Sequence, residues 1–238
     1  MVDLHTHILP GMDDGAESPE MSVAMLRAEW EDGVDTVALT PHFYRERESI
    51  ERFLKRRDEA MQRLQAYIAS QPEETQNSLP RLILGAEVAW MPNMWMWDGL
   101  ERLCYEGTHM LMVELPTGPW KIRLMSDLCY LANQTGLMPM LAHFDRYFGL
   151  QKHKMLQEAA SLGLPLQISA DALLHFHTRH RALELLRQGG GYLISDCHNL
   201  TKRPPNIGKG EAVLQKHFDE DKVDAVLQQT EDLLTSKY

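Results

Sequence analysis

Short apolar runs alternate with longer amphipathic segments along almost the whole chain. Seven of these runs have the length and composition of buried strands; they cover residues 2–7, 35–42, 82–87, 109–115, 137–143, 164–169 and 192–198. Helical patterns follow most of them, and no segment is long enough to be a linker between domains. This alternation predicts an α/β fold of parallel strands with crossover helices. A distorted seven-stranded α/β barrel fits best, and an open doubly wound sheet is the alternative.

The ends and apolar faces of the helices are also marked in the sequence. Ser18 is a typical N-cap for the first helix, which Gly33 closes. In the second, apolar residues recur at three- and four-residue spacing over 50–68. Further predictions are a helix over 121–136 that ends at a glycine, a last helix capped by Asp221, and a surface loop over 71–80.

Composition narrows the class of protein. The 238 residues are 44% hydrophobic, enough for a single domain over residues 1–238 with a substantial core. The formal net charge of -10 argues against a nucleic-acid partner. The three scattered cysteines indicate no disulfide framework, and neither a leader nor an apolar run of about 20 residues is visible. We therefore expect a soluble, cytoplasmic protein without a membrane span.

Residues able to bind a metal stand where the predicted strands end. His5 and His7 close the first strand two residues apart, so their side chains share a face. The other candidates at or just after strand ends are Asp14, His42, Glu87, Glu114, His143, Asp196 and His198. In a parallel barrel all these ends open on one face. One such residue is usually a polar side chain meeting solvent, but recurrence at strand after strand indicates a metal centre. The sixth strand offers only Asp171, a weaker candidate.

The chemistry of this set points to phosphate esters. Imidazole and carboxylate ligands without thiolate suit manganese, iron or zinc. Five histidines and four carboxylates are more than a single ion can use. Two or three divalent ions would clamp a phosphoryl group and activate a water molecule.

The stretch DCHNLTKR, residues 196–203, allows a different mechanism. Cys197 and Arg203 have the spacing of a loop in which a thiolate attacks a phosphate ester. Such a loop usually needs glycine so that its N–H groups can turn inward, and this stretch has none. If Asp196 and His198 face the site, Cys197 faces the helices. The metal mechanism is therefore favoured.

Sequence blocks along nearly the whole chain resemble the PHP superfamily. DLHTHILPGMDDGAES, TPHF, GAE, VELP, HFDRY and SDCHNLTKRPPN occur in that family's order and spacing. More narrowly, the chain resembles the PHP-type bacterial protein-tyrosine phosphatases of capsular and exopolysaccharide operons. This resemblance implies a distorted seven-stranded barrel with a trinuclear site in which manganese is favoured.

The resemblance also assigns the candidate residues. It implies three ligand sets: His5, His7, Glu87 and Asp196; Glu87, Glu114 and His143; and Asp14, His42 and His198. It implies that Arg146 and Arg203 bind the substrate phosphate, a use suited to planar guanidinium groups. Only the resemblance favours Asp14 over Asp13 as the ligand.

This chain departs from the family pattern in two places. It has His143, Phe144, Asp145 and Arg146 where the family has His-Pro-Glu-Arg, so the orientation of Arg146 is less firmly implied. It has Phe43 where the family often has a second histidine, which is expected to alter the rim of the pocket.

The implied function is hydrolysis of phosphotyrosine in proteins. The partner that the resemblance suggests is an autophosphorylated bacterial tyrosine kinase that controls polysaccharide export. The rivals are another PHP phosphoesterase such as a histidinol-phosphate phosphatase, a cysteine phosphatase, and a non-catalytic binding module. The sequence is compatible with a homo-oligomer but does not fix the oligomeric state.

Three other features have simpler interpretations. The histidines of HFHTRHR fit neither one helix face nor one strand face and indicate a solvated helix start. MPNMWMW indicates a hydrophobic loop or short helix that packs on the barrel, with an aromatic wall or subunit contact as the minor alternatives. Arg45 and Arg47 lie just past His42, where they could approach an anionic substrate.

Overall fold

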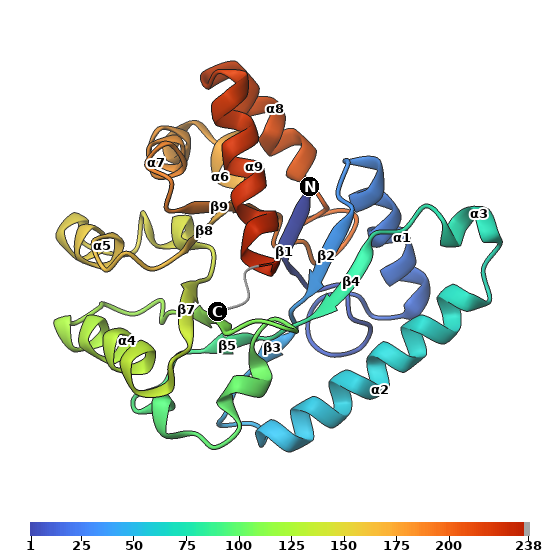
Figure 1. Cartoon of the computed structure of the whole chain (residues 1–238), viewed down its shortest axis with the longest axis horizontal. Helices are drawn as coiled ribbons and strands as arrows, with labels where there is room; N and C mark the ends of the chain where they lie inside the picture. The colour runs from blue at the N-terminus through green and yellow to red at the C-terminus, as the bar shows by residue number, and fades with distance from the viewer. Residues whose placement is uncertain (236–238) are drawn as a thin grey trace.

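The computed structural model describes residues 1–235, which contain nine strands in two parallel sheets (Figure 1). The strands are β1 (Val2–Thr6), β2 (Thr36–Leu39), β3 (His42–Phe43), β4 (Arg81–Leu84), β5 (Glu87–Ala89), β6 (Met110–Glu114), β7 (Met138–Leu141), β8 (Leu166–Ser169) and β9 (Gly191–Ile194). One sheet has the order β1-β2-β4 and the other β3-β5-β6-β7-β8-β9. The predicted α/β fold with parallel strands is confirmed.

The predicted closed barrel of seven strands is not confirmed, because neither sheet closes within residues 1–235. Two predicted strands are interrupted: 35–42 divides into β2 and β3, and 82–87 divides into β4 and β5. Pro41 has no N–H to continue a ladder. Gly85 lies in close contact with its neighbours, since a Cβ there would come within 3.1 Å of Thr40 and Tyr105. The chain therefore bends where the sequence pattern reads as continuous strand.

Backbone hydrogen bonds bring the ends of the strands together across the two sheets. The N–H of Asp196 donates to the carbonyl of His5, and that of His7 to Cys197, both at 2.9 Å. The N–H of Glu87 donates to Pro41 at 3.0 Å. These bonds place the segments with the candidate ligands side by side.

Helices surround the strands in Figure 1. They are α1 (Pro19–Glu31), α2 (Ile50–Ala69), α3 (Glu73–Gln76), α4 (Ile122–Thr135), α5 (His153–Ala160), α6 (Ala170–Leu174), α7 (Phe176–Arg187), α8 (Ile207–His217) and α9 (Glu220–Thr235), with 3₁₀ helices η1 (Met94–Met96), η2 (Leu100–Leu103) and η3 (Phe144–Tyr147). No helix within residues 1–235 is both long and apolar enough to cross a membrane.

The helix ends agree with the sequence in part. Ser18 caps α1 by accepting from the N–H of Met21, as predicted. The cap of α9 is Asp219, whose carboxylate accepts from Lys222 N–H at 2.9 Å, whereas Asp221 lies in the first turn. The prediction of Asp221 as the cap was therefore wrong by two residues. The predicted loop 71–80 also contains the short helix α3.

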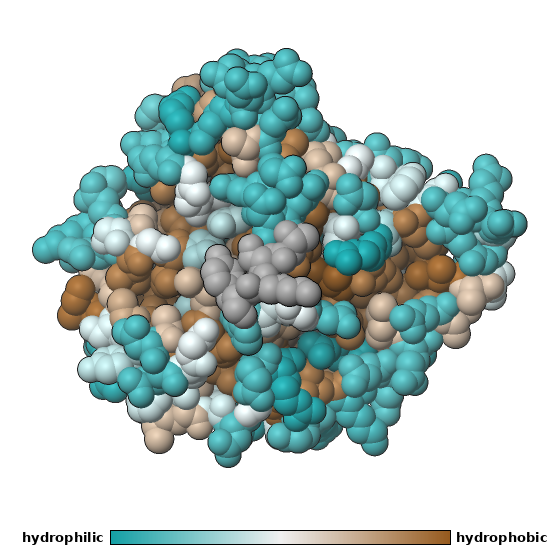
Figure 2. Space-filling view, in the orientation of Figure 1, coloured by the Kyte–Doolittle hydropathy of each residue, from teal (hydrophilic) through white to brown (hydrophobic). Residues whose placement is uncertain are grey.

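The apolar face of α2 anchors this long helix to the core. Phe53, Leu54 and Leu64 are buried on it, in accord with the predicted spacing. Full burial of such side chains contributes roughly 1.5–3 kcal/mol each. Figure 2 shows a largely hydrophilic surface on this face of the molecule, with apolar residues mainly in its recesses. Because its apolar face anchors α2 in the core, the helix holds the segment that precedes it, residues 44–49, beside the strand ends.

Candidate metal centre

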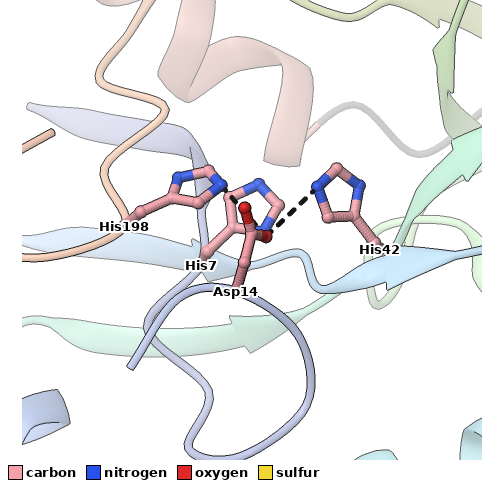
Figure 3. A group of neighbouring side chains, drawn as sticks. All are labelled: His7, Asp14, His42 and His198. Atoms are coloured by element: carbon pink, nitrogen blue, oxygen red, sulfur yellow. Dashed lines mark ion pairs between the residues drawn. The ribbon is translucent and has the colours of Figure 1, made fainter. Parts of the chain in front are cut away.

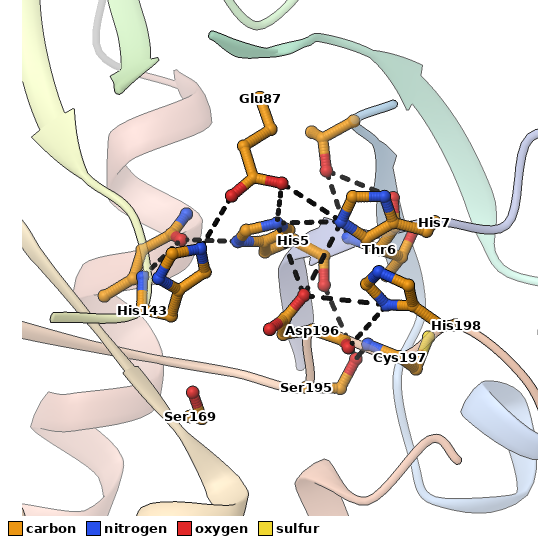
Figure 4. Close-up of polar contacts among 12 residues, drawn as sticks. His5, Thr6, His7, Glu87, His143, Ser169, Ser195, Asp196, Cys197 and His198 are labelled. Atoms are coloured by element: carbon orange, nitrogen blue, oxygen red, sulfur yellow. Dashed lines mark hydrogen bonds and ion pairs between the residues drawn. The ribbon is translucent and has the colours of Figure 1, made fainter. Parts of the chain in front are cut away.

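Four buried side chains aim their ligand atoms at one point (Figure 4). The Nε2 atoms of His5 and His7 are 3.1 Å apart. Both lie 3.2 Å from Oε2 of Glu87, and they lie 3.6 and 3.5 Å from Oδ1 of Asp196. Ligands about 2.1 Å from a tetrahedral cation are separated by roughly 3.4 Å. The ligand atoms of His5, His7 and Glu87 have the spacing expected around one divalent ion, and Asp196 lies beside both histidines.

The other carboxylate oxygen of Glu87 belongs to a second group. Oε1 of Glu87 lies 2.6 Å from Nε2 of His143, which in turn is 3.8 Å from Oε1 of Glu114. The structure also brings His42 to this carboxylate, with Nδ1 at 2.9 Å from Oε2. Glu87 therefore connects two groups of ligands through its two oxygens.

Figure 3 shows a third group, formed by His7, Asp14, His42 and His198. Oδ1 of Asp14 lies 3.6 Å from Nε2 of His42 and 3.5 Å from Nε2 of His198. The rings of His7 and His198 are 3.8 Å apart between centroids. The side chain of Asp14 is 69% exposed, so this carboxylate forms the solvent side of the cluster.

The structure distinguishes the two adjacent aspartates. Oδ2 of Asp13 accepts from Nδ1 of His7 at 2.7 Å and from the N–H of His42 at 2.9 Å. Burial opposes ionisation of Asp13, but the His7 imidazole and these N–H groups hold its pKa well below its usual value. Asp13 thus orients His7 from behind, as carboxylates do for metal-bound histidines. Asp14 is left to face the cluster.

Gln167 in β8 orients His5 in the same way, and sequence reasoning missed it. Its Oε1 lies 2.7 Å from Nδ1 of His5. Its Nε2 lies 3.0 Å from the hydroxyl of Tyr105, which donates to the carbonyl of Leu4. The available signal was a lone amide within the apolar run LPLQIS. A fully buried amide must find partners, and here the partner is a candidate ligand.

Replacing Gln167 with Leu is expected to weaken manganese binding about 10- to 100-fold, because His5 loses the group that fixes its tautomer and ring orientation. Titration of chelated protein with manganese measures this directly. Gln157→Leu on the exposed face of α5 is the matched control and should bind as the wild type does. Unchanged affinity in Gln167→Leu would show that this hydrogen bond does not support the centre.

Several buried polar atoms of the cluster form no hydrogen bond of acceptable geometry within residues 1–235, although most of them lie at ion-pair distance from another ligand atom. They are Oε2 of Glu87, Oδ1 of Asp196, Nδ1 of His42 and Nδ1 of His143. An unsatisfied buried polar group costs about 1–3 kcal/mol, and more when charged. Divalent cations would satisfy the two carboxylate oxygens, which lie within the first group of ligand atoms. The residues present therefore fit the metal centre that the sequence predicts.

The electrostatics of the cluster favour ionised carboxylates. Burial raises the pKa of Glu87 and of Asp196, but the charges and hydrogen bonds of the surrounding histidines, with His5 the largest, together hold both pKa values well below their usual range. Burial and the nearby charge of His7 lower the pKa of His198 to about 4, so its imidazole is neutral. Burial opposes protonation of His5 and His7, but the neighbouring carboxylates raise the pKa of both imidazoles, so a divalent cation would displace their protons when it binds.

Two candidate ligands have strained backbones. The φ angles of His143 and Asp196 are +29° and +56°, a region that residues other than glycine seldom adopt. Such conformations cost on the order of 1–3 kcal/mol each and cluster at functional sites. The hydrogen bond from Asp196 N–H to His5 helps to hold this conformation at the end of β9.

The two candidate phosphate-binding arginines meet at the open side of the cluster. Arg146 donates to Oδ2 of Asp196 at 2.9 Å and to Oε1 of Glu114 at 3.1 Å. Arg203 contacts the same oxygen of Asp196 and lies 2.8 Å from Nε2 of His198. Both side chains are about one-third exposed and line a cavity of about 360 Å³. They can therefore reach a ligand from solvent.

Asp145, which stands where the family has a glutamate, has a structural role. Oδ1 of Asp145 accepts from the N–H of Ser169 at 2.8 Å and from its hydroxyl at 3.0 Å. Burial raises the pKa of Asp145 to about 6. These bonds tie η3 to the end of β8 and fix the base of Arg146. Asp171 in turn accepts from Asn206 at 2.8 Å, outside the cluster.

The expectation that Phe43 alters the rim of the pocket was wrong. Phe43 is fully buried and packs against Phe53 and Trp97, with ring centroids 5.1 and 6.2 Å away. Alternation along β3 turns the residue after His42 into the core.

Cys197 faces the helices, as predicted. Its thiol donates to Oε1 of Glu29 in α1 at 3.4 Å, and both residues are fully buried. Burial and the charge of Glu29 raise the pKa of the thiol well above its usual value. This environment is opposite to that of a reactive thiolate.

The simpler interpretations of two other sequence features hold. The histidines of HFHTRHR are exposed at the start of α7. The segment MPNMWMW contains the short helix η1, whose first residue, Met94, is buried. Neither segment joins the cluster.

Fold and cluster together define the class: a parallel α/β protein with a candidate polynuclear metal centre at its strand ends. The chain belongs to the family described as capsular polysaccharide synthesis, CpsB/CapC, whose sequence model matches residues 1–235.

Two relatives show the extent of similarity. The chain is 26% identical to the tyrosine-protein phosphatase CpsB of Streptococcus pneumoniae, over 92% of this chain and 91% of that protein. It is 26% identical to the tyrosine-protein phosphatase YwqE of Bacillus subtilis (strain 168), over 92% and 85%.

Solved structures agree on the fold. One is from a study of YwqE from Bacillus subtilis and CpsB from Streptococcus pneumoniae, described as unique metal-dependent tyrosine phosphatases; it matches with a TM-score of 0.79 at 22% identity, over 100% of this chain and 96% of that one. The phosphotriesterase homology protein from Escherichia coli, complexed with phosphate, matches with a TM-score of 0.54 at 13% identity, over 99% and 98%.

Proposed function

We propose that this protein is a metal-dependent protein-tyrosine phosphatase that acts in capsule or exopolysaccharide synthesis. The observation that carries the proposal is the convergence of five imidazoles and four carboxylates on one face, with buried carboxylate oxygens that lie against imidazoles without forming hydrogen bonds. Family membership and the phosphatase names of the relatives support it. The cytoplasm is the proposed location.

The proposed ligands are His5, His7, Asp14, His42, Glu87, Glu114, His143, Asp196 and His198. Two or three divalent ions bound by them, with manganese favoured over iron or zinc, would act as Lewis acids toward phosphoryl oxygens and lower the pKa of the attacking water. The protein's own contribution is to hold these groups rigidly: Asp13 and Gln167 fix the rings of His7 and His5.

Arg146 and Arg203 would bind the equatorial oxygens of the phosphate. Both guanidinium groups converge on one oxygen of Asp196, so their donors stand side by side at the open edge of the cluster, where an anion would enter. Planar guanidinium groups match two phosphate oxygens at once. The tyrosine phenol leaves with a pKa of about 10, so its departure depends less on a general acid than that of an aliphatic alcohol.

Initial rates on a phosphotyrosine peptide, a phosphoserine peptide and histidinol phosphate, with manganese present, test this function. The proposal predicts the highest kcat/KM on the phosphotyrosine peptide. Preference for histidinol phosphate would instead make the protein a small-molecule phosphatase. Failure to hydrolyse any of the three while manganese is bound would support a binding module.

A further inference from the structure

A second cavity, of about 530 Å³, opens beside the candidate metal centre. Asp14 and His42, which Figure 3 shows at the edge of the third ligand group, form part of its wall. The remaining wall residues are Met12 and Asp13, the segment after β3, which includes Arg47, and the first turns of α2, which include Arg52 and Arg56. A substrate bound at the metals would therefore extend into this cavity or along its edge.

The acidic residues of this cavity are already engaged. Asp13 is bound to His7 and His42, and Asp14 is a proposed metal ligand. Glu48 accepts from Arg56 and lies 3.9 Å from Arg52. One glutamate thus balances the charge of two arginines, so the wall formed by α2 carries excess positive charge.

Arg47 is the arginine best placed to use that charge. It makes no ion pair within residues 1–235, and its guanidinium lies 4.3 Å from the centroid of the Tyr44 ring. The Tyr44 ring stacks on His42 with centroids 5.3 Å apart. The sum of these two distances is an upper limit on the separation between the Arg47 guanidinium and the His42 ring. Tyr44 acts as a platform that holds Arg47 beside the metal centre.

We propose that this cavity is a subsite for an acidic residue next to the phosphotyrosine, and that Arg47 binds its carboxylate. The inference rests on the proposed phosphatase function of the adjacent centre. An extended peptide advances about 3.3–3.6 Å per residue, so a side chain within roughly three positions of the phosphotyrosine reaches Arg47. Arginine suits a carboxylate because its fork can bind both oxygens. In a chain of net charge -10, a local basic wall is also what lets an acidic peptide approach.

Two phosphotyrosine peptides that differ only in glutamate or glutamine at the flanking positions test this subsite. The wild type should hydrolyse the glutamate peptide with a kcat/KM about two- to fivefold higher, the range for a solvent-exposed ion pair. In Arg47→Gln this ratio should fall to about one. In Arg47→Glu the glutamine peptide should become the better substrate. The preference of the wild type should also weaken at high ionic strength.

Lys55→Gln is the matched control. Lys55 is exposed on α2 and lies outside the cavity, and its replacement removes one positive charge, as Arg47→Gln does. This variant should keep the wild-type ratio. Equal rates on the two peptides in the wild type, or an undiminished ratio in Arg47→Gln, would overturn the subsite and leave the phosphatase activity standing. Absence of hydrolysis of either peptide by the manganese-loaded wild type would contradict both proposals.

Discussion

Glu87→Gln is expected to lower kcat on a phosphotyrosine peptide by on the order of a thousandfold or more, since several kcal/mol of metal-derived stabilisation is lost. Glu87 is the side chain whose two oxygens reach two ligand groups, at 3.2 Å from His5 and His7 and at 2.6 Å from His143. An amide keeps the shape but carries no charge and offers one oxygen. Bound metal, measured by elemental analysis, should fall together with kcat.

Glu184→Gln, an exposed substitution on α7, controls for the change of charge and should retain both kcat and metal. Wild-type metal content and near-normal kcat in Glu87→Gln would contradict the central position given to this carboxylate.

Arg203→Gln is expected to lower kcat/KM about 100- to 1,000-fold, as removal of a preorganised donor to a developing oxyanion does. Metal content should stay close to that of the wild type, because Arg203 contacts Asp196 and His198 without being a ligand itself. Arg203→Lys should recover only part of the rate, since an ammonium group cannot reproduce the planar fork.

The neighbouring exposed residue provides the control for Arg203. Lys202→Gln removes the same charge from the same loop and should change kcat/KM little. If Arg203→Gln lost its metal in proportion to its activity, Arg203 would be a support of Asp196 and not a phosphate-binding group.

Much of this site could be predicted from the sequence because its residues follow a simple rule of parallel sheets. His5, His7, Glu114 and His143 stand at the ends of strands that the apolar pattern already marks. The same alternation predicted that Cys197 would face the helices, where its thiol meets Glu29. Local periodicity therefore gave most of the candidate ligands and the argument against a thiolate, whereas the choice of Asp14 over Asp13 rested on the family resemblance.

Other features depend on contacts between distant residues. Gln167 and His5 are 162 positions apart, and neither neighbourhood shows that they share a hydrogen bond. The roles of Asp13 and Asp14 separate only when the loop closes on His7 and His42. The break at Gly85 likewise depends on Thr40 and Tyr105, which lie so close to it that a side chain would not fit. Strand periodicity carries no information on such long-range geometry.

The measurement that tests the metal centre most directly is the initial rate on a phosphotyrosine peptide before chelation, after chelation and after manganese is restored. A metal centre predicts loss of activity on chelation and recovery with manganese, in the wild type and equally in Cys197→Ser. Activity that survived thorough chelation, or that disappeared in Cys197→Ser with metal still bound, would contradict the metal centre and point to a thiolate mechanism.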